Sequence, residues 1–331
     1  MAKTVRNSKK SIKNVVDIYE HAPSLKKNKK EDIAIEISHL TKDYGKGRGL
    51  FDVSFIVPKG KTFGYCGTNG AGKTTTLRHI MGFLKPDSGF VKVYGMDAWK
   101  NSTEIKKFIG YLPGEIAFPQ LETGSDFLKV QAEMLEVTDM SRAEEIINAL
   151  QLDPTANLKR MSKGMKQKTA LVAAFMHHPE IILLDEPTTG LDPLMRESFI
   201  NIIKQEKERG ATIIMSNHMF DELEETCDYV GFIKDGHLVD IVDMNEIHER
   251  PFREFIVSLK DKKSFEKVDA SQVKVLTKDE EHFTYIVRVE NEKIDGMFRE
   301  LNKVNVKLIK EVQYTLEKYF MENVIGGMKD E

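Results

Sequence analysis

Hydrophobic residues between Ile33 and Asp243 follow two spacings, one typical of strands and the other of helices. Short apolar runs predict strands at 53–57, 62–66, 181–184, 212–215 and 229–233. After the second run, a helix is expected to present one apolar face made of Leu77, Ile80, Met81 and Leu84. Strands that alternate with helices in this way predict a parallel sheet covered by helices.

Residues 125–176 show helical spacing almost throughout, which predicts a helical subdomain inserted between the strands. One of its helices is expected to open at Ser141, because Glu144 three residues later completes the pattern of a capping box. Near the end of the alternating region, Asp235-Gly236 predicts a hairpin turn into a further strand at 238–241.

A third region begins near Arg250, where the patterns change again. Strand-like segments occur at 252–259, 273–276, 283–289 and 304–308, and helical spacing occurs at 294–301 and after Thr315. This order is close to β-α-β-β-α-β with a terminal helix, which predicts a small α+β domain. We therefore divide the chain into an N-terminal extension (1–32), a main domain (33–245) and a C-terminal accessory domain (250–331).

The N-terminal extension is strongly basic. Between Met1 and Lys30 there are nine Lys or Arg and two acidic residues, a local charge of +7 (9 minus 2). An apolar helix stripe is formed by Ile12, Val15, Val16 and Tyr19. The segment either forms a short helix that lies on an anionic membrane or a partner, or is a mobile, solvated tail, which we favour.

Composition excludes several classes of protein. The 331 residues include 49 Lys or Arg and 52 Asp or Glu, and this balance argues against binding to nucleic acid through bulk charge. Apolar runs are far shorter than the roughly 20 residues of a membrane span, and the N-terminus lacks the apolar core of a secretory signal. The two cysteines, Cys66 and Cys227, are expected to be core residues in a reducing compartment.

Residues Gly67–Thr74 (GTNGAGKT) match the phosphate-loop pattern G-x-x-x-x-G-K-[ST], between a predicted strand and a predicted helix. Glycines allow backbone N–H groups to surround phosphate oxygens, and the helix N-terminus adds partial positive charge. Lys73 can reach the β- and γ-phosphates, and Thr74 offers a hydroxyl to Mg²⁺. Unless the match is a chance glycine-rich turn, this segment predicts nucleotide binding.

Two carboxylates, Asp185 and Glu186, end the apolar strand at 181–184. Asp185 suits Mg²⁺, directly or through water, and Glu186 could orient or deprotonate an attacking water. By itself this pattern is also common for a buried strand followed by an acidic turn. Beside a phosphate loop it predicts metal-assisted phosphoryl transfer.

Four further segments carry weaker signals. Ser162 is a plausible helix N-cap 23 residues before Asp185 (185 minus 162), and Gly190-Leu191-Asp192-Pro193 follows the two carboxylates. His218 follows the strand at 212–215, at the edge where open α/β sheets place their sites. Tyr44 precedes the phosphate loop and could stack on a nucleobase. Taken alone, Ser162 would simply cap a helix, and a histidine such as His218 is usually structural. Tyr44 alone is just as often a core or surface aromatic.

In this order, the segments resemble the ATP-binding cassette (ABC) family over about residues 33–243. The phosphate loop corresponds to Walker A, 184–186 to the end of Walker B, 161–165 to the signature, 190–193 to the D-loop, His218 to the switch histidine and Tyr44 to the adenine-stacking aromatic. Lys163 and Met165 depart from the usual Leu-Ser-Gly-Gly-Gln signature. The Ser162–Gln167 sequence and the C-terminal extension ending at 315–320 resemble single-cassette subunits of drug and antibiotic exporters.

The resemblance implies an α/β P-loop NTPase cassette with a mixed sheet and an inserted helical subdomain. It also implies ATP and Mg²⁺ as cofactors, and a head-to-tail homodimer in which each ATP lies between one Walker A and the partner's signature. Such a subunit is cytoplasmic, lies peripherally on the inner face of the cell membrane and drives a separate integral membrane permease. The permease would select the substrate, and no nucleic acid is expected as a partner.

The resemblance further implies the roles of individual residues. Glu186 and His218 would be catalytic, and Thr74 and Asp185 would hold the metal. The nucleotide would be bound by Tyr44, Gly67, Asn69, Gly70, Ala71, Gly72, Lys73, Thr74 and Thr75, and by Ser162 and Gly164 of the second chain.

The segment 109–115 departs from the family pattern. The family usually places Gln or Glu directly after the proline, whereas here Gly114 follows Pro113 and Glu115 comes next. We expect Glu115, displaced by one position, to contact the metal site and the permease, with the Gly114 carbonyl or a water as the alternative.

Two rival functions explain less of the sequence. A soluble cassette ATPase that acts as a nucleotide switch on nucleic acid or ribosomes usually has two cassettes or long coiled coils, and this chain has one Walker A and no sustained heptads. A P-loop kinase would not account for the signature or for His218.

Overall fold

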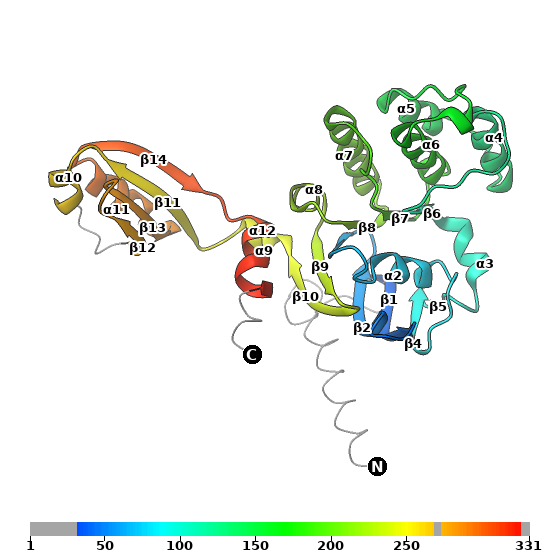
Figure 1. The fold of residues 1–331 in the computed structure, drawn as a ribbon, viewed down its shortest axis with the longest axis horizontal. Helices are drawn as coiled ribbons and strands as arrows, with labels where there is room; N and C mark the ends of the chain where they lie inside the picture. The colour runs from blue at the N-terminus through cyan, green and yellow to red at the C-terminus, as the bar shows by residue number, and fades with distance from the viewer. Residues whose placement is uncertain (1–31, 268–272, 326–331) are drawn as a thin grey trace, which may run out of the picture. The chain divides into compact units, whose positions relative to one another are not determined.

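The computed structural model describes residues 32–267 and 273–325, and they form two compact units that divide between Met244 and Asn245 (Figure 1). The expectations for the N-terminal extension fall outside the described residues, except for Asp32. Among the described residues, no helix combines the length and the apolar character needed to cross a membrane.

The first unit is built on a six-stranded sheet in the order β10-β9-β3-β8-β7-β6. Five of its strands run parallel: β3 (Thr62–Cys66), β6 (Ile109–Leu112), β7 (Ile181–Asp185), β8 (Thr212–Asn217) and β9 (Tyr229–Lys234). The sixth, β10 (His237–Asp243), pairs antiparallel with β9 after the predicted turn at Asp235-Gly236, where both residues have positive φ. The sheet is therefore mixed, which confirms the prediction.

A second, antiparallel sheet has the order β2-β1-β4-β5. Its strands are β1 (Ile33–Asp43), β2 (Gly49–Pro58), β4 (Ser88–Val93) and β5 (Met96–Asp97). The two sheets share one core, in which Phe55 of β2 stacks on Phe63 of β3 with ring centroids 4.8 Å apart. Only β2 was expected from the apolar runs.

Helices complete the first unit: α2 (Lys73–Ile80), α3 (Ser102–Ile105), α4 (Gly124–Met134), α5 (Ser141–Ala149), α6 (Lys163–Phe175), α7 (Pro193–Glu208) and α8 (Phe220–Thr226). Figure 1 shows α4, α5 and α6 gathered apart from the strands of the antiparallel sheet, as the inserted helical subdomain.

The predicted capping box at Ser141 is wrong. Met140 is the N-cap of α5, and the N–H of Ser141 donates to Asp139 Oδ1 (2.9 Å), so the local turn uses Asp139 as its acceptor. A capping box does open the preceding helix, α4, where Thr123 and Asp126 exchange side-chain and backbone hydrogen bonds.

The second unit begins within α9 (Met244–His248) and has the predicted order of elements after it. These are β11 (Phe252–Leu259), α10 (Lys262–Lys267), β12 (Lys274–Asp279), β13 (Thr284–Glu290), α11 (Ile294–Leu301), β14 (Val306–Val312) and α12 (Leu316–Tyr319). The sheet order is β12-β13-β11-β14, antiparallel throughout. One face carries the unit's own core, in which Phe265 of α10 stacks on Tyr285 of β13 at 4.4 Å.

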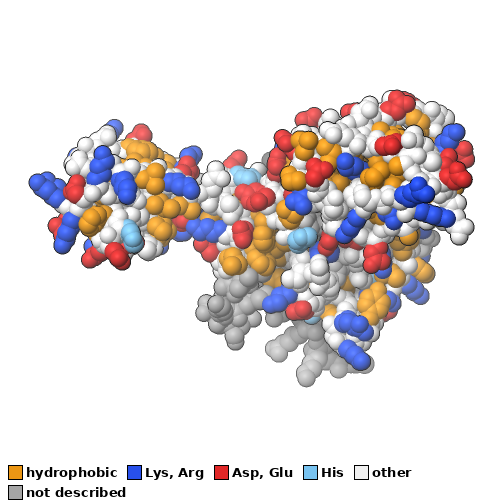
Figure 2. Space-filling view, turned by 45° about the horizontal axis from the view of Figure 1, so that its top comes forward, with side chains coloured by type: hydrophobic (Ala, Val, Ile, Leu, Met, Phe, Trp, Pro, Cys, Tyr) orange, Lys and Arg blue, Asp and Glu red, His pale blue; other side chains and the backbone are white. Residues whose placement is uncertain are grey.

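Charged side chains of both signs are interspersed over the face of the protein shown in Figure 2. On that face, positive and negative side chains do not separate into two large patches of opposite charge.

Candidate nucleotide-binding and catalytic site

The phosphate loop connects β3 to α2, and its path requires glycine. Gly72 has a φ of 115°, and a Cβ there would lie 2.5 Å from Leu50 Cδ2 of β2. From the other side, Gly236 of the β9–β10 turn donates its N–H to the Ala71 carbonyl at 3.0 Å. Two parts of the fold far apart in sequence therefore hold the loop in its turned conformation.

Lys73 lies under this loop with only 5% of its surface exposed. Its Nζ donates to the carbonyls of Gly67 (2.7 Å) and Thr68 (3.2 Å) and lies 3.6 Å from Glu186 Oε1. A buried ammonium group needs such partners, and here they hold it between the loop and the Walker B carboxylate. The ammonium group is placed to meet a phosphate bound by the loop.

Asp185, at the end of β7, is 1% exposed and accepts one hydrogen bond on each oxygen. Thr74 Oγ1 donates to Oδ2 (2.6 Å), and Ser216 Oγ of β8 donates to Oδ1 (2.5 Å). The structure thus brings together the hydroxyl and the carboxylate that the sequence predicts as metal ligands. Both are hard oxygen donors, so these residues fit Mg²⁺.

Glu186 adopts a backbone conformation that residues other than glycine rarely take, with φ at 49°. Its N–H donates to the Ser216 hydroxyl (3.0 Å) and carbonyl (3.2 Å), and its Oε2 accepts from Thr189 Oγ1 (3.5 Å). From the signature helix, Gln167 Nε2 donates to the Pro187 carbonyl (2.7 Å). The strained turn directs the carboxylate of Glu186 toward Lys73 rather than into the sheet.

His218 directly follows β8, with an exposed side chain. Its backbone N–H donates to Asn217 Oδ1 at 2.7 Å. Among the described contacts, its ring makes no hydrogen bond to Glu186. The structure therefore places the two predicted catalytic residues at the ends of neighbouring strands without joining their side chains.

Gly114 follows β6, and its backbone lies against the predicted metal site. A Cβ at this position would lie 2.9 Å from Asp185 Oδ2. Glu115, the next residue, is exposed. Sequence reasoning identified this segment as unusual, but the close approach of Gly114 to Asp185 could only be seen in the folded chain.

The signature lies at the start of α6, where Ser162 is the N-cap and its Oγ accepts from the Met165 N–H at 3.2 Å. A Cβ on Gly164 would lie 2.7 Å from the Gly190 carbonyl, so the signature packs on the D-loop of its own chain. Ser162 is exposed, and in the described residues no hydrogen bond joins it to the phosphate loop. The chain does not bring its own signature to its own phosphate loop.

Tyr44 lies between β1 and β2, and 49% of its surface is exposed. The N–H of Tyr44 donates to the Arg48 carbonyl (2.9 Å), which closes a turn next to Gly49 and Leu50. Because Leu50 packs against Gly72, this turn is adjacent to the phosphate loop. An exposed ring at this position is available for stacking on a base.

Both cysteines are buried, as expected. Burial raises the pKa of the Cys66 thiol to about 11 and that of the Cys227 thiol to about 12, so neither forms a reactive thiolate near neutral pH.

Known proteins share this sequence pattern. Residues 50–189 match the model of the ABC transporter family. The bacitracin transport ATP-binding protein of Bacillus licheniformis is 31% identical over 310 residues, which cover 88% of this chain and 98% of that protein. The linearmycin resistance ATP-binding protein of Bacillus subtilis (strain 168) is 34% identical over 230 residues, 68% of this chain and 74% of that protein.

Solved structures share the fold. An ATP-binding subunit of an ABC transporter superposes with a TM-score of 0.59 at 27% identity, over 65% of this chain and 92% of that chain. A dimeric cassette bound to ADP and Pi superposes with a TM-score of 0.58 at 23% identity, over 63% and 98% of the two chains, a likeness of fold alone. Because the bacitracin relative aligns over nearly its whole length, the chain belongs to the ABC transporter family, as an ATP-binding subunit that hydrolyses ATP.

Proposed function

We propose that this subunit powers export through a separate membrane permease, as a head-to-tail homodimer at the inner face of the membrane. The dimer is supported by the way the site is divided within one chain. Lys73, Asp185 and Glu186 lie together around the phosphate loop. The signature residue Ser162 is exposed and makes no hydrogen bond to this loop in the described residues. A second chain supplies the missing signature. Export is supported by the bacitracin and linearmycin relatives, because both belong to antibiotic transport or resistance.

In the proposed site, loop N–H groups and Lys73 bind the ATP phosphates, and Tyr44 stacks on the adenine. Thr74 and Asp185 hold Mg²⁺, directly or through water; when bound, the ion offsets charge on the phosphate oxygens. Ser162 and Gly164 of the second chain contact the γ-phosphate.

The chemistry of the proposed mechanism is hydrolysis of the terminal phosphoanhydride. Glu186 accepts a proton from the attacking water, whose oxygen bonds to the γ-phosphorus. The bond from the γ-phosphorus to the β–γ bridging oxygen breaks, giving ADP and phosphate. His218, directly after the neighbouring strand β8, orients the γ-phosphate, and hydrolysis opens the dimer.

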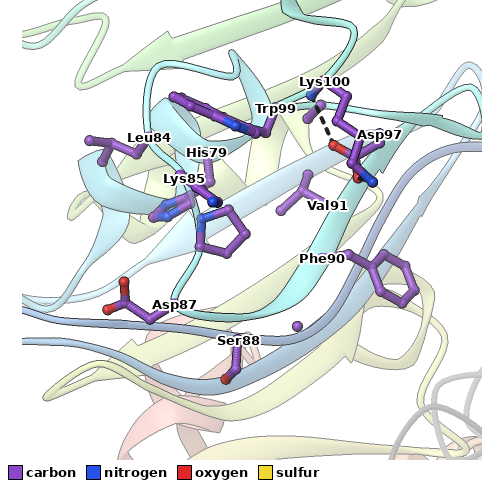
Figure 3. Close-up of a pocket in the computed structure, with 13 residues that line it drawn as sticks. His79, Leu84, Lys85, Asp87, Ser88, Phe90, Val91, Asp97, Trp99 and Lys100 are labelled. Atoms are coloured by element: carbon purple, nitrogen blue, oxygen red, sulfur yellow. Dashed lines mark hydrogen bonds and ion pairs between the residues drawn. The ribbon is translucent and has the colours of Figure 1, made fainter.

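A pocket of about 190 Å³ on the first unit suits docking by the permease. Figure 3 shows Trp99 and Phe90 on different sides of this pocket. Trp99 is 44% exposed, although it is a large aromatic side chain. An exposed aromatic at the rim of a pocket is typical of a protein interface, and a cytoplasmic segment of the permease is the occupant we propose.

Membrane association tests this proposal. We expect the chain to sediment with membranes only when its permease is co-expressed, and Trp99→Ala to weaken this association. Phe298→Ala, which alters an exposed aromatic of the second unit, serves as the matched control. Sedimentation with ribosomes or nucleic acid, independent of the permease, would instead support the nucleotide-switch alternative, which no comparison favours.

The same preparation tests the role proposed for Glu115. If Glu115 couples ATP turnover to the permease, Glu115→Ala reduces permease-stimulated turnover more than basal turnover, and Glu115→Gln shows which part of the effect needs the charge. Glu122→Ala, at an exposed carboxylate later in the connection between β6 and α4, should leave both rates unchanged. Equal behaviour of all variants and the parent protein would leave the Gly114 backbone as the contact.

A further inference from the structure

A buried carboxylate lies behind the catalytic loops and has no role in the site described above. Glu222 of α8 is 5% exposed. Its Oε2 accepts hydrogen bonds from Thr188 Oγ1 (2.8 Å) and Asn217 Nδ2 (2.5 Å), while its Oε1 is buried and has no hydrogen-bond partner among the described residues. Burying a carboxylate with one unmatched oxygen is unfavourable, so a residue that served stability alone would be better replaced by an apolar side chain.

The contact with Asn217 determines how that side chain is oriented. A carboxylate accepts hydrogen bonds and does not donate them, so Glu222 must face the NH₂ group of the Asn217 amide. The amide oxygen then points the other way, where it accepts from the backbone N–H groups of His218 (2.7 Å) and Met219 (3.0 Å). Glu222 thereby fixes the acceptor that holds the backbone of the switch-histidine loop.

The other contact anchors Glu222 itself. Thr188 lies two residues after Glu186, in the segment that leads from Walker B to the D-loop. A second bond on the helix, from Thr226 Oγ1 to the Glu222 backbone carbonyl (2.6 Å), leaves the carboxylate untouched. The chain Thr188–Glu222–Asn217–His218 is therefore continuous from the Walker B segment to the histidine.

We infer that Glu222 is a positioning residue for ATP hydrolysis: it holds His218 in place through Asn217, with Thr188 as its anchor. This inference rests on the role proposed above for His218. The side-chain hydrogen bonds of Glu222 in the described residues are with Thr188 and Asn217 and not with the phosphate loop, so we expect it to act on turnover and not on nucleotide affinity.

The test compares steady-state ATP turnover of Glu222→Gln in two backgrounds, the parent protein and His218→Ala. The native carboxylate offers only acceptors to Asn217, whereas the amide introduced by this substitution also presents donors and frees Asn217 to rotate. In the parent background we expect kcat to fall about tenfold, with KM for ATP changed less than about twofold. In the His218→Ala background, Glu222→Gln should cause no further loss of kcat.

Two controls separate positioning from general stability. Asn217→Ala should reproduce the kcat loss, and Thr226→Val, which alters the same helix without touching the carboxylate, should leave kcat within about twofold. Melting temperatures are measured for every variant, because a purely structural effect lowers stability and activity alike in both backgrounds.

The outcomes are distinct. An equal fold-loss of kcat with and without His218, or an unchanged kcat in Glu222→Gln, would overturn the inference while the proposed function stands. If His218→Ala itself hydrolyses ATP at the parent rate, the role of His218 is wrong and the inference falls with it.

Discussion

At Gly114, the position that a side chain would occupy is too close to Asp185 for a Cβ atom. A Cβ there would come within 2.9 Å of Asp185 Oδ2, an atom already fixed by Thr74 and enclosed by β7 and β8. Gly114→Ala would therefore push Asp185 away from Thr74 and disturb the two residues proposed to hold the metal. We expect ATP turnover to fall by about 10- to 100-fold, because small displacements at a reacting centre have effects of that size.

The measurement is Mg²⁺-dependent ATP turnover, with Gly95→Ala as the control for placing alanine at a turn glycine. Gly95 has open space around its Cβ position but a φ of 78°, so that variant has only a local backbone penalty. Full activity of Gly114→Ala would show that the contact with Asp185 has no functional importance.

The roles of single residues could be predicted from the sequence where they depend on short motifs of adjacent residues. The phosphate loop and the two carboxylates at the end of β7 carry their chemistry in short segments, so their types and spacing predict it. Contacts between distant segments could not be predicted in this way. Ser216 bonds to Asp185, and Glu222 to Thr188, only because the fold places β7, β8 and α8 side by side.

Among the secondary-structure elements, α5 and α7 are joined by a buried ion pair. Arg142 of α5 donates from Nε (3.1 Å) and NH2 (2.7 Å) to Glu206 Oε1 of α7, and Glu206 is 1% exposed. Arg209 bonds to the other oxygen, Oε2, at 2.6 Å. This pair ties the helical subdomain, which carries the signature, to the helix that follows the D-loop.

Removing one partner of this pair should destabilise the fold. Arg142→Met leaves Glu206 with Arg209 alone, and we expect the free energy of unfolding to fall by about 3 kcal/mol, the lower end for a broken buried pair. Urea unfolding measures the loss, with Arg160→Met at an exposed position of the same subdomain as the control. Equal stability of the two variants would contradict this account of the interface.

Apolar runs predicted the buried parallel strands well, because such strands are enclosed on both faces. The antiparallel sheet was mostly missed, although Ile35 and Ile37 of β1 alternate with Glu36 and Ser38. Its strands β4 and β5 are short, and the pairings of β1 contain register shifts. The capping box predicted at Ser141 is wrong because Asp139 accepts the hydrogen bond from the Ser141 backbone N–H, which the Glu144 side chain was expected to accept.

For the whole molecule, the two units have separate cores and separate sheets. We expect residues 250–331 to form an accessory domain that regulates the subunit or supports its dimer and holds no catalytic group. All the contacts of the phosphate loop and the Walker B carboxylates described above come from the first unit. Truncation after Glu249, which keeps the buried Ile247 of α9, should leave ATP affinity within about threefold of the parent value.

Titration with a fluorescent ATP analogue measures that affinity, and circular dichroism confirms that the truncated protein is folded. Apolar surface that the truncation exposes would lower the solubility of the shortened protein without changing its affinity for ATP. A folded truncation that no longer binds nucleotide would show that the domain division is wrong.

The most direct test of the whole account is the ATP turnover and association state of Glu186→Gln. Glutamine keeps the shape of the side chain and removes the base, so nucleotide binding should persist while turnover falls by a factor on the order of 10² or more. Size-exclusion chromatography should then show an ATP-dependent dimer, which the parent protein loses as it hydrolyses ATP. Near-normal turnover in Glu186→Gln, or a variant that stays monomeric with saturating ATP, would contradict the account.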